Sequence, residues 1–196
     1  MKNVVVLVSG GGTNLQAILD AQENGTIQSA RVALVISNRK DAYALERAKA
    51  YNIPSAVFTK KQAGSQDAFE DRLIEAIEGA HADLIVLAGF LAILSARFTS
   101  HFEGKIINVH PSLIPAFCGE GFYGLKVHEA ALERGVKLTG ATVHYVNEIP
   151  DGGKILAQKA VEVLAGDTPE ILQRRVMEQA EWVLLPQIIE MLTKEA

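Results

Sequence analysis

Cysteine is nearly absent from this chain, which has 196 residues and a single thiol at Cys118. One cysteine excludes an internal disulfide framework and fits a protein of the reducing cytoplasm. The sequence also lacks any cluster of cysteines or closely spaced histidines of the kind that holds a zinc ion. We therefore expect a cytoplasmic protein that has no disulfide and needs no metal.

Long apolar runs and blocks of basic residues are missing as well. The first apolar run, residues 4–8, is too short for the hydrophobic segment of a signal peptide, and no later run could span a bilayer. The formal net charge is -4, and no basic block stands out. We therefore expect no membrane association and no nucleic-acid partner. Small anionic ligands remain compatible with this charge, because they need only a few local donors.

The composition that is present is that of a globular protein, with 48% hydrophobic and 21% charged residues. A chain of 196 residues forms one well-buried domain more readily than two small ones. No internal repeat and no low-complexity linker divides it. We therefore expect a single domain over residues 1–196.

Short apolar runs alternate with stretches of helical period in the first part of the chain. Strands that are buried on both faces and separated by helices are typical of a parallel sheet with right-handed crossovers. Thr13 and Gln16 have the spacing of a capping box, and Asp41 is the expected cap of the next helix. Apolar residues at helical spacing predict a further helix over residues 69–77. The expected strands are residues 4–8, 32–36, 56–58, 84–88 and 106–109.

The pattern changes after about residue 138. Residues 141–146 alternate in part, residues 151–153 are an Asp-Gly-Gly turn signal, and residues 155–161 form a second extended run. Thr168 and Pro169 then suit the first positions of a last helix. The expected fold class is α/β, a single doubly wound, mostly parallel sheet with a C-terminal antiparallel hairpin.

Three consecutive glycines at residues 10–12 link the first strand to the first helix. Glycines let the backbone approach a ligand, and a helix N-terminus offers free N–H groups to a phosphate. A P-loop is excluded because no lysine follows, and a dinucleotide fingerprint is excluded because Leu15 stands where a small residue is needed. We predict a site for a mononucleotide-type or sugar phosphate, with a tight turn that binds nothing as the alternative.

Asn108 and His110 stand two residues apart at the end of an expected strand, which Pro111 terminates. A hydrogen-bond donor beside a proton-transfer group suits the chemistry of a carbonyl. A catalytic histidine usually needs a carboxylate partner, and Asp151 is the candidate. From the sequence alone, an ordinary turn residue is the simpler interpretation of that aspartate.

The other four histidines have simpler expected roles. His81 and His101 lie in polar connecting sequence and are expected on the surface. His128 begins a helical stretch, where it caps or lines a loop. His144 lies on a hairpin strand, where packing is at least as good an interpretation as chemistry.

Five motifs, each modest alone, together resemble the phosphoribosylglycinamide formyltransferases of purine biosynthesis. They are SGGGTN at 9–14, LAGFL at 87–91, NVHPSLIP at 108–115, TGATVH at 139–144 and DGG at 151–153. The resemblance implies transfer of a formyl group from 10-formyltetrahydrofolate to the amine of glycinamide ribonucleotide, by a monomer or a homodimer. It also implies a phosphate- and ribonucleotide-binding half in residues 1–100 and a catalytic and folate-binding half in residues 101–196.

The resemblance assigns a role to each family position. The catalytic trio is Asn108, His110 and Asp151, with Asn108 and His110 as donors to the developing oxyanion and His110 as the proton-transfer group. The N–H groups of Gly12, Thr13 and Asn14 would hold the phosphate, and Glu181 would contact the ribonucleotide. The implied folate contacts are Gln66, Leu91, Ala92, Ile93, Leu94, Asn108, Val146, Asn147 and Glu148.

Some residues depart from the family pattern. Ala92 replaces an arginine of many relatives, Gln66 replaces a basic residue of some, and Trp182 stands where a histidine is common. The spacing before Glu181 is shifted. The segment 117–124, which carries Cys118, is longer than in some members and is either a mobile lid or an extra loop.

Other formyl-folate enzymes share the Asn-x-His and Asp chemistry. A methionyl-tRNA formyltransferase would carry a further C-terminal domain and a basic surface, and a 10-formyltetrahydrofolate hydrolase usually has an additional N-terminal regulatory domain. A non-catalytic nucleotide-binding module would need the glycine loop but not Asn108, His110 and Asp151. We expect the ribonucleotide transferase in preference to all three.

Overall fold

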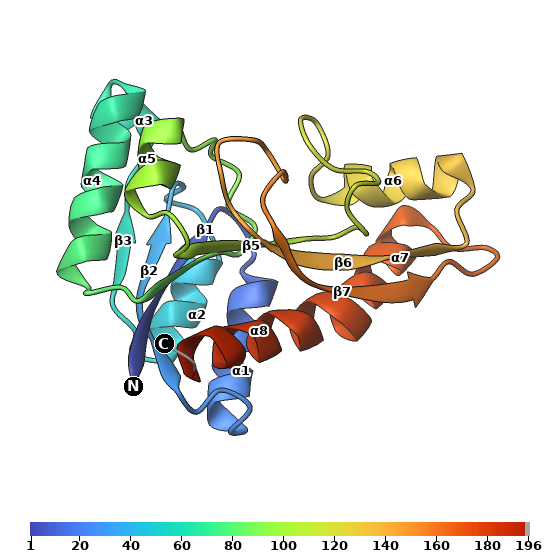
Figure 1. The fold of residues 1–196 in the computed structure, drawn as a ribbon, viewed down its shortest axis with the longest axis horizontal. Coiled ribbons are helices and arrows are strands. Elements are labelled where there is room, and N and C mark those ends of the chain that lie inside the picture. Colours follow the sequence, from blue (N-terminus) through green and yellow to red (C-terminus); the bar gives the residue numbers. More distant parts are fainter. Residues whose placement is uncertain (195–196) are drawn as a thin grey trace.

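A sheet of seven strands forms the centre of the protein in the computed structural model, which describes residues 1–194 (Figure 1). The strand order is β3-β2-β1-β4-β5-β6-β7. Parallel pairs join β3 through β5, and antiparallel pairs join β5 to β6 and β6 to β7. This arrangement confirms the mostly parallel sheet with a C-terminal hairpin. The strands are β1 Lys2–Val8, β2 Ala30–Ser37, β3 Ser55–Val57, β4 Leu84–Leu87, β5 Ile106–His110, β6 Leu138–Tyr145 and β7 Ile155–Glu162.

Helices cover both faces of this sheet, and α1 and α8 cross on one of them (Figure 1). None of the helices within residues 1–194 combines the length and apolar character needed to span a membrane. The helices are α1 Thr13–Glu23, α2 Ala44–Ala50, α3 Lys60–Ala63, α4 Gln66–Gly79, α5 Ala96–His101, α6 Leu125–Arg134, α7 Pro169–Val176 and α8 Trp182–Lys194, with a π-helix, η1, at Met177–Glu181.

The core has two parts because successive side chains of a strand point to opposite faces. On one face, Val4 and Val6 of β1 pack with buried residues of α1 and α8 such as Leu185. On the other face, Val5 packs with residues of α4 such as Leu73. Complete burial of one such side chain stabilises the fold by about 1.5–3 kcal/mol. The two layers hold the strand ends in fixed relative positions.

Two predicted helix starts are wrong. Gly12, not Thr13, is the N-cap of α1, with a left-handed φ of 71° and no side-chain cap. A Cβ at Gly12 would lie 2.6 Å from Cβ of Ala44, so the loop turns there because glycine alone fits. The Gln16 side chain bonds to Asp20 and Tyr51 instead of reaching back. Helix α2 begins at Ala44.

Asp41, the predicted cap of α2, pairs instead with Arg39 at 3.0 Å on the surface. The cap at Thr168 is confirmed, since its side chain accepts a hydrogen bond from Ile171 N at 3.4 Å and Pro169 follows.

The last helix is not continuous, because η1 separates α7 from α8. A π-helix inserts an extra residue into a helical path. Glu181 is the last residue of this π-helix.

Candidate active site

The predicted functional segments meet at one edge of the sheet. Strands β1, β4 and β5 are neighbours and parallel, so the glycine loop, residues 88–94 and the end of β5 follow their carboxyl ends. A hydrogen bond of 2.8 Å from Leu91 N to Ser9 Oγ joins the first two segments. In open α/β sheets, ligands bind at such an edge, where the strand order reverses. The reversal here lies between β1 and β4.

Asp151 lies between two imidazoles at this edge. Its Oδ2 is 3.4 Å from His110 Nδ1, and its Oδ1 is 3.6 Å from His144 Nε2. Oδ2 also accepts the N–H of Gly119 at 2.8 Å. Asp151 is 14% exposed at its side chain, whereas His110 and His144 are 5% and 2% exposed. The carboxylate is therefore the part of this group that a ligand in the cleft can reach.

The turn that carries Asp151 requires its glycines. Asp151 itself has a positive φ of 54°. A Cβ on Gly153 would collide with the carbonyl of Tyr145, and one on Gly152 would lie 2.6 Å from Ile149 Cγ2. The Asp-Gly-Gly motif is thus a backbone requirement that points the carboxylate back toward β5.

His144 sets the orientation of Asn108. The two residues are directly paired across β5 and β6, and Asn108 Nδ2 lies 3.2 Å from His144 Nε2. His144 Nδ1 lies 2.8 Å from the Tyr145 carbonyl, which can only accept, so Nδ1 carries the proton. In the neutral ring Nε2 is then an acceptor and receives an N–H of the Asn108 amide.

His110 directs one ring nitrogen to a backbone carbonyl and the other ring nitrogen to Asp151. Its Nε2 donates to the Phe117 carbonyl at 2.8 Å, so in the neutral ring Nδ1 is a bare acceptor that faces the carboxylate. Burial lowers the pKa of His110, and the charge of Asp151 offsets part of that effect. Burial raises the pKa of Asp151, but the imidazoles of His144 and His110 and the Gly119 N–H together bring it below its ordinary value.

A cleft of about 810 Å³ opens beside these residues. Its lining includes eight of the nine predicted folate contacts: Leu91, Ala92, Ile93, Leu94, Asn108, Val146, Asn147 and Glu148. Residues of the segment 117–124 form another wall, so that segment covers the site. His110 does not line the cleft, because the side chain is buried beneath Phe117.

Gln66 stands behind the cleft wall. Its Nε2 donates to the Ile93 carbonyl at 3.0 Å and to Glu70 Oε1 at 2.6 Å. Glu70 is fully buried and also accepts Ser95 N at 2.7 Å and Ser95 Oγ at 2.5 Å. Burial raises the pKa of Glu70, but these donors and Arg97 bring it below the ordinary value. Glu70 thus fixes the segment that forms the wall, and sequence reasoning missed it.

Comparison with known proteins gives the family. A family model described as "Formyl transferase" matches residues 2–189. A phosphoribosylglycinamide formyltransferase of Haemophilus influenzae is 43% identical over 99% of this chain and 88% of its own length. A chloroplastic one of Arabidopsis thaliana is 40% identical over 91% of this chain and 61% of its own length. The crystal structure of glycinamide ribonucleotide transformylase 1 from Symbiobacterium toebii matches with a TM-score of 0.92 at 42% identity, over 100% of this chain and 89% of that one.

The chain belongs to the formyl transferase family. In this family member, the start of α1 brings together the remaining predicted residues. The first N–H groups of a helix have no intrahelical partner, which leaves those of Gly12, Thr13 and Asn14 for a ligand. The Arg47 Nε donates to the Gly11 carbonyl at 2.8 Å and holds the loop from α2.

Glu181 reaches the same place from the far end of the chain. Asn14 Nδ2 donates to Glu181 Oε2 at 2.7 Å. Burial raises the pKa of Glu181 to about 7, against the smaller lowering effect of the Asn14 amide. Asn14 Oδ1 is buried without a hydrogen-bond partner among residues 1–194. The π-helix sets the position of Glu181, since Glu181 is its last residue.

The other histidines and Cys118 differ in how well they match the roles predicted from the sequence. His81 and His101 are exposed, as expected. His128 neither caps nor lines a loop: it is buried within α6, and neither ring nitrogen has a partner among the described residues. Burial, with a smaller effect of His110, lowers its pKa to about 4. Burial and Asp151 raise the pKa of the Cys118 thiol, so this thiol is not activated.

His144 lies on a hairpin strand, as predicted, but its contact with Asn108 was not foreseen. The only sequence signal was the alternation of residues 141–146, which puts Thr142 and His144 on one face. Its position opposite Asn108 depends on the register of β6 against β5, and no residue pattern gives that register. Within residues 1–194, no group of three or more side chains is arranged as a metal site.

Proposed function

We propose that this chain is a phosphoribosylglycinamide formyltransferase, which moves the formyl group of 10-formyltetrahydrofolate to the amine of glycinamide ribonucleotide in purine biosynthesis. The observation that carries the proposal is the meeting of an oriented amide, Asn108, with the Asp151 carboxylate in one cleft. The names of the family's similar members support the same substrates.

Asn108 stabilises the oxyanion. When the glycinamide amine attacks the formyl carbon, the carbonyl oxygen becomes negative in a tetrahedral intermediate. The Asn108 amide has one N–H directed to His144 and a second one available for that oxygen. The loss of one such donor typically costs about 10²–10³ in rate. His144 acts through Asn108, because its protonated Nδ1 leaves Nε2 to fix the amide.

His110 and Asp151 handle the proton. The attacking nitrogen must lose a proton and the folate N10 must gain one before the bond from carbon to N10 breaks. His110 is neutral at pH 7, since its pKa lies below the ordinary value. Because His110 does not line the cleft, the proton reaches its bare Nδ1 through Asp151 or a bridging water. The Asp151 carboxylate, 3.4 Å from Nδ1, would stabilise the resulting imidazolium. Such transfer typically contributes about 10²–10⁴. No metal takes part in these steps.

The two substrates approach from the two sides of this group. The phosphate of the ribonucleotide rests on the N–H groups of Gly12, Thr13 and Asn14, with Glu181 near its ribose. The folate occupies the cleft of about 810 Å³. With Ala92 and Gln66 at positions that are basic in other members, the backbone of residues 91–94 and 146–148 carries most of its recognition.

We propose further that residues 1–196 act as one cytoplasmic formyltransferase domain. Residues 1–100 supply the phosphate-binding side, and residues 101–196 supply the catalytic and folate-binding side. Glu181 crosses between them through its hydrogen bond to Asn14, so the halves function together.

The decisive experiment offers the purified protein 10-formyltetrahydrofolate with each of three acceptors. We expect a formylated product with glycinamide ribonucleotide, and none with tRNA or with water alone. Release of formate at the same rate without the ribonucleotide would favour the hydrolase. Asn108→Ala is the matched variant. It removes the amide that His144 orients and leaves the glycine loop unchanged.

A further inference from the structure

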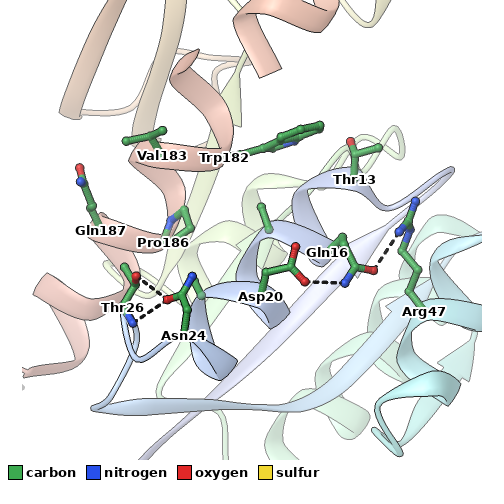
Figure 2. Close-up of a pocket in the computed structure, with 12 residues that line it drawn as sticks. Thr13, Gln16, Asp20, Asn24, Thr26, Arg47, Trp182, Val183, Pro186 and Gln187 are labelled. Carbon is green, nitrogen blue, oxygen red and sulfur yellow. Dashed lines mark hydrogen bonds between the residues drawn. The ribbon is translucent and has the colours of Figure 1, made fainter. Parts of the chain in front are cut away.

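A second concave site lies between α1 and α8, on the side of the molecule shown in Figure 2. This groove has a volume of about 420 Å³, within the range of small-molecule sites. One face of α1 forms a wall over residues 13–24, a length of about 16 Å at the rise of an α-helix. The groove shares no lining residue with the cleft beside Asp151.

The middle of the groove has apolar residues beside a flat aromatic wall, and the Asp20 carboxylate lines it as well. The Trp182 indole extends from the start of α8 over the first turn of α1, toward Thr13 (Figure 2). Ala17 on α1 leaves room beside it, and Pro186 on α8 continues the apolar surface. The Nε1 of Trp182 has no hydrogen-bond partner among residues 1–194. An indole with open space beside it is a stacking surface for a planar ring.

The end of the groove at Thr13 is positive. Arg47 lines it and is held there by two bonds, from Nε to the Gly11 carbonyl and from Nη1 to Gln16 Oε1, each 2.8 Å. Gln16 Nε2 in turn donates to Asp20 Oδ1 at 2.7 Å (Figure 2). The guanidinium and the N-terminus of α1 therefore favour an anion at this end.

The opposite end of the groove is polar and uncharged. The exposed side chains of Asn24 and Gln187 line it from α1 and α8. Amides offer both donors and acceptors, which suits the polar edge of a heterocyclic base. The groove thus presents a cation, an aromatic wall and amide groups in that order.

We propose that this groove binds a nucleoside 5′-monophosphate, with the phosphate beside Arg47 at the start of α1 and the base against Trp182. The groove reaches Thr13, one of the three residues whose N–H groups the phosphate of the proposed ribonucleotide substrate needs. A nucleotide in the groove would therefore compete with that substrate and not with the folate. Binding in the groove does not depend on formyl transfer, so the two proposals can fail separately.

Tryptophan fluorescence tests the proposal directly, because Trp182 is the only tryptophan of the chain. AMP is the probe, with adenosine and ribose 5-phosphate as its two halves. We expect saturable quenching by AMP, with an affinity at least about tenfold above that of adenosine, which lacks the charge-assisted phosphate contacts. An AMP titration without quenching, or AMP binding no tighter than ribose 5-phosphate, would overturn the proposal.

Substitutions then locate the site. Ala17→Leu fills the middle of the groove and is expected to abolish quenching by AMP, while Ala50→Leu, an exposed position on α2, leaves it unchanged. Asn24→Ala with Gln187→Ala, at two exposed positions, should weaken AMP and leave ribose 5-phosphate unaffected. Circular dichroism checks that each variant is folded. Equal quenching in Ala17→Leu and the native protein would place AMP elsewhere and refute the assignment.

Discussion

Asp151 and Glu181 are both carboxylic acids shielded from water, yet their surroundings shift their pKa values in opposite directions. Burial raises the pKa of each. Asp151 also has an N–H donor from Gly119 and two imidazoles within 3.6 Å, and its pKa falls below the ordinary value. Glu181 has one amide, and its pKa rises to about 7. Hydrogen-bond donors and nearby imidazoles, not depth alone, decide whether a buried acid stays charged.

The difference has a functional meaning. Asp151 remains an anion throughout the neutral range, as a group that stabilises an imidazolium must. Glu181 is partly protonated near neutral pH and can act as donor or acceptor toward a neighbouring group. A site with a fixed charge and a site with a variable charge therefore lie at the two ends of the proposed ribonucleotide position.

Removal of the charge of Asp151 should have the largest effect. Asp151→Asn keeps an acceptor for the Gly119 N–H but loses the anion that His110 faces, so kcat should fall by about 10²–10⁴. Steady-state kinetics measure this loss. The control is Asp167→Asn, which breaks another ion pair with little exposure, 2.5 Å from Arg175. The control should lose stability and keep its kcat; a full kcat in Asp151→Asn would contradict the proposed role.

The second prediction concerns stability at Glu181. Because its folded pKa is raised above 4.5 to about 7, its stabilising contribution is complete below the unfolded value and is lost as pH rises through the folded value. Glu181→Gln removes that loss. Relative to the native protein, the variant should gain at most about 3 kcal/mol between pH 4.5 and 8. Urea unfolding at several pH values measures the difference, and parallel pH curves for the two proteins would show the assignment to be wrong.

Glu70 should show the opposite sign. Its pKa is lowered despite full burial, so its contribution is present above the unfolded value and is lost as pH falls through the folded one. Glu70→Gln leaves the Ser95 donors poorly matched, at a cost of about 1.5–3 kcal/mol at pH 7.

Because Glu70 holds residues 93–95 through Gln66 and Ser95, the same variant should raise KM for the folate and leave KM for the ribonucleotide unchanged. A comparison of the two KM values separates this positioning effect from a general loss of fold. An equal rise in both would contradict it.

The sequence predicted the features that depend on local pattern. The apolar run at residues 4–8 lies in β1, and the change of residue pattern after residue 138 marks the start of the hairpin. Asn108 and His110 were found because a strand end gives two alternate residues a common face. The approach of Asp151 rested on resemblance, since its distance to His110 depends on how the hairpin folds back.

Features that depend on tertiary contacts were missed. The Thr13 cap failed because Gly12 takes a left-handed conformation against Ala44, a contact between two helices. The place of His144 needed a strand register. Glu70 looks like any acidic helix residue until Ser95 is seen to cap the next helix against it.

The smallest effect is expected at a pair that repeats the chemistry of Asp151 and His110 in water. Glu78 Oε1 lies 2.8 Å from His101 Nε2, closer than the buried pair, but the two side chains are 59% and 42% exposed. An exposed ion pair gains little, because solvent screens the charges and the side chains lose freedom. Glu78→Gln should leave both kcat and the thermal unfolding midpoint unchanged, as calorimetry can check. A clear loss of stability would mean that distance, and not environment, governs the carboxylate–imidazole pairs of this protein.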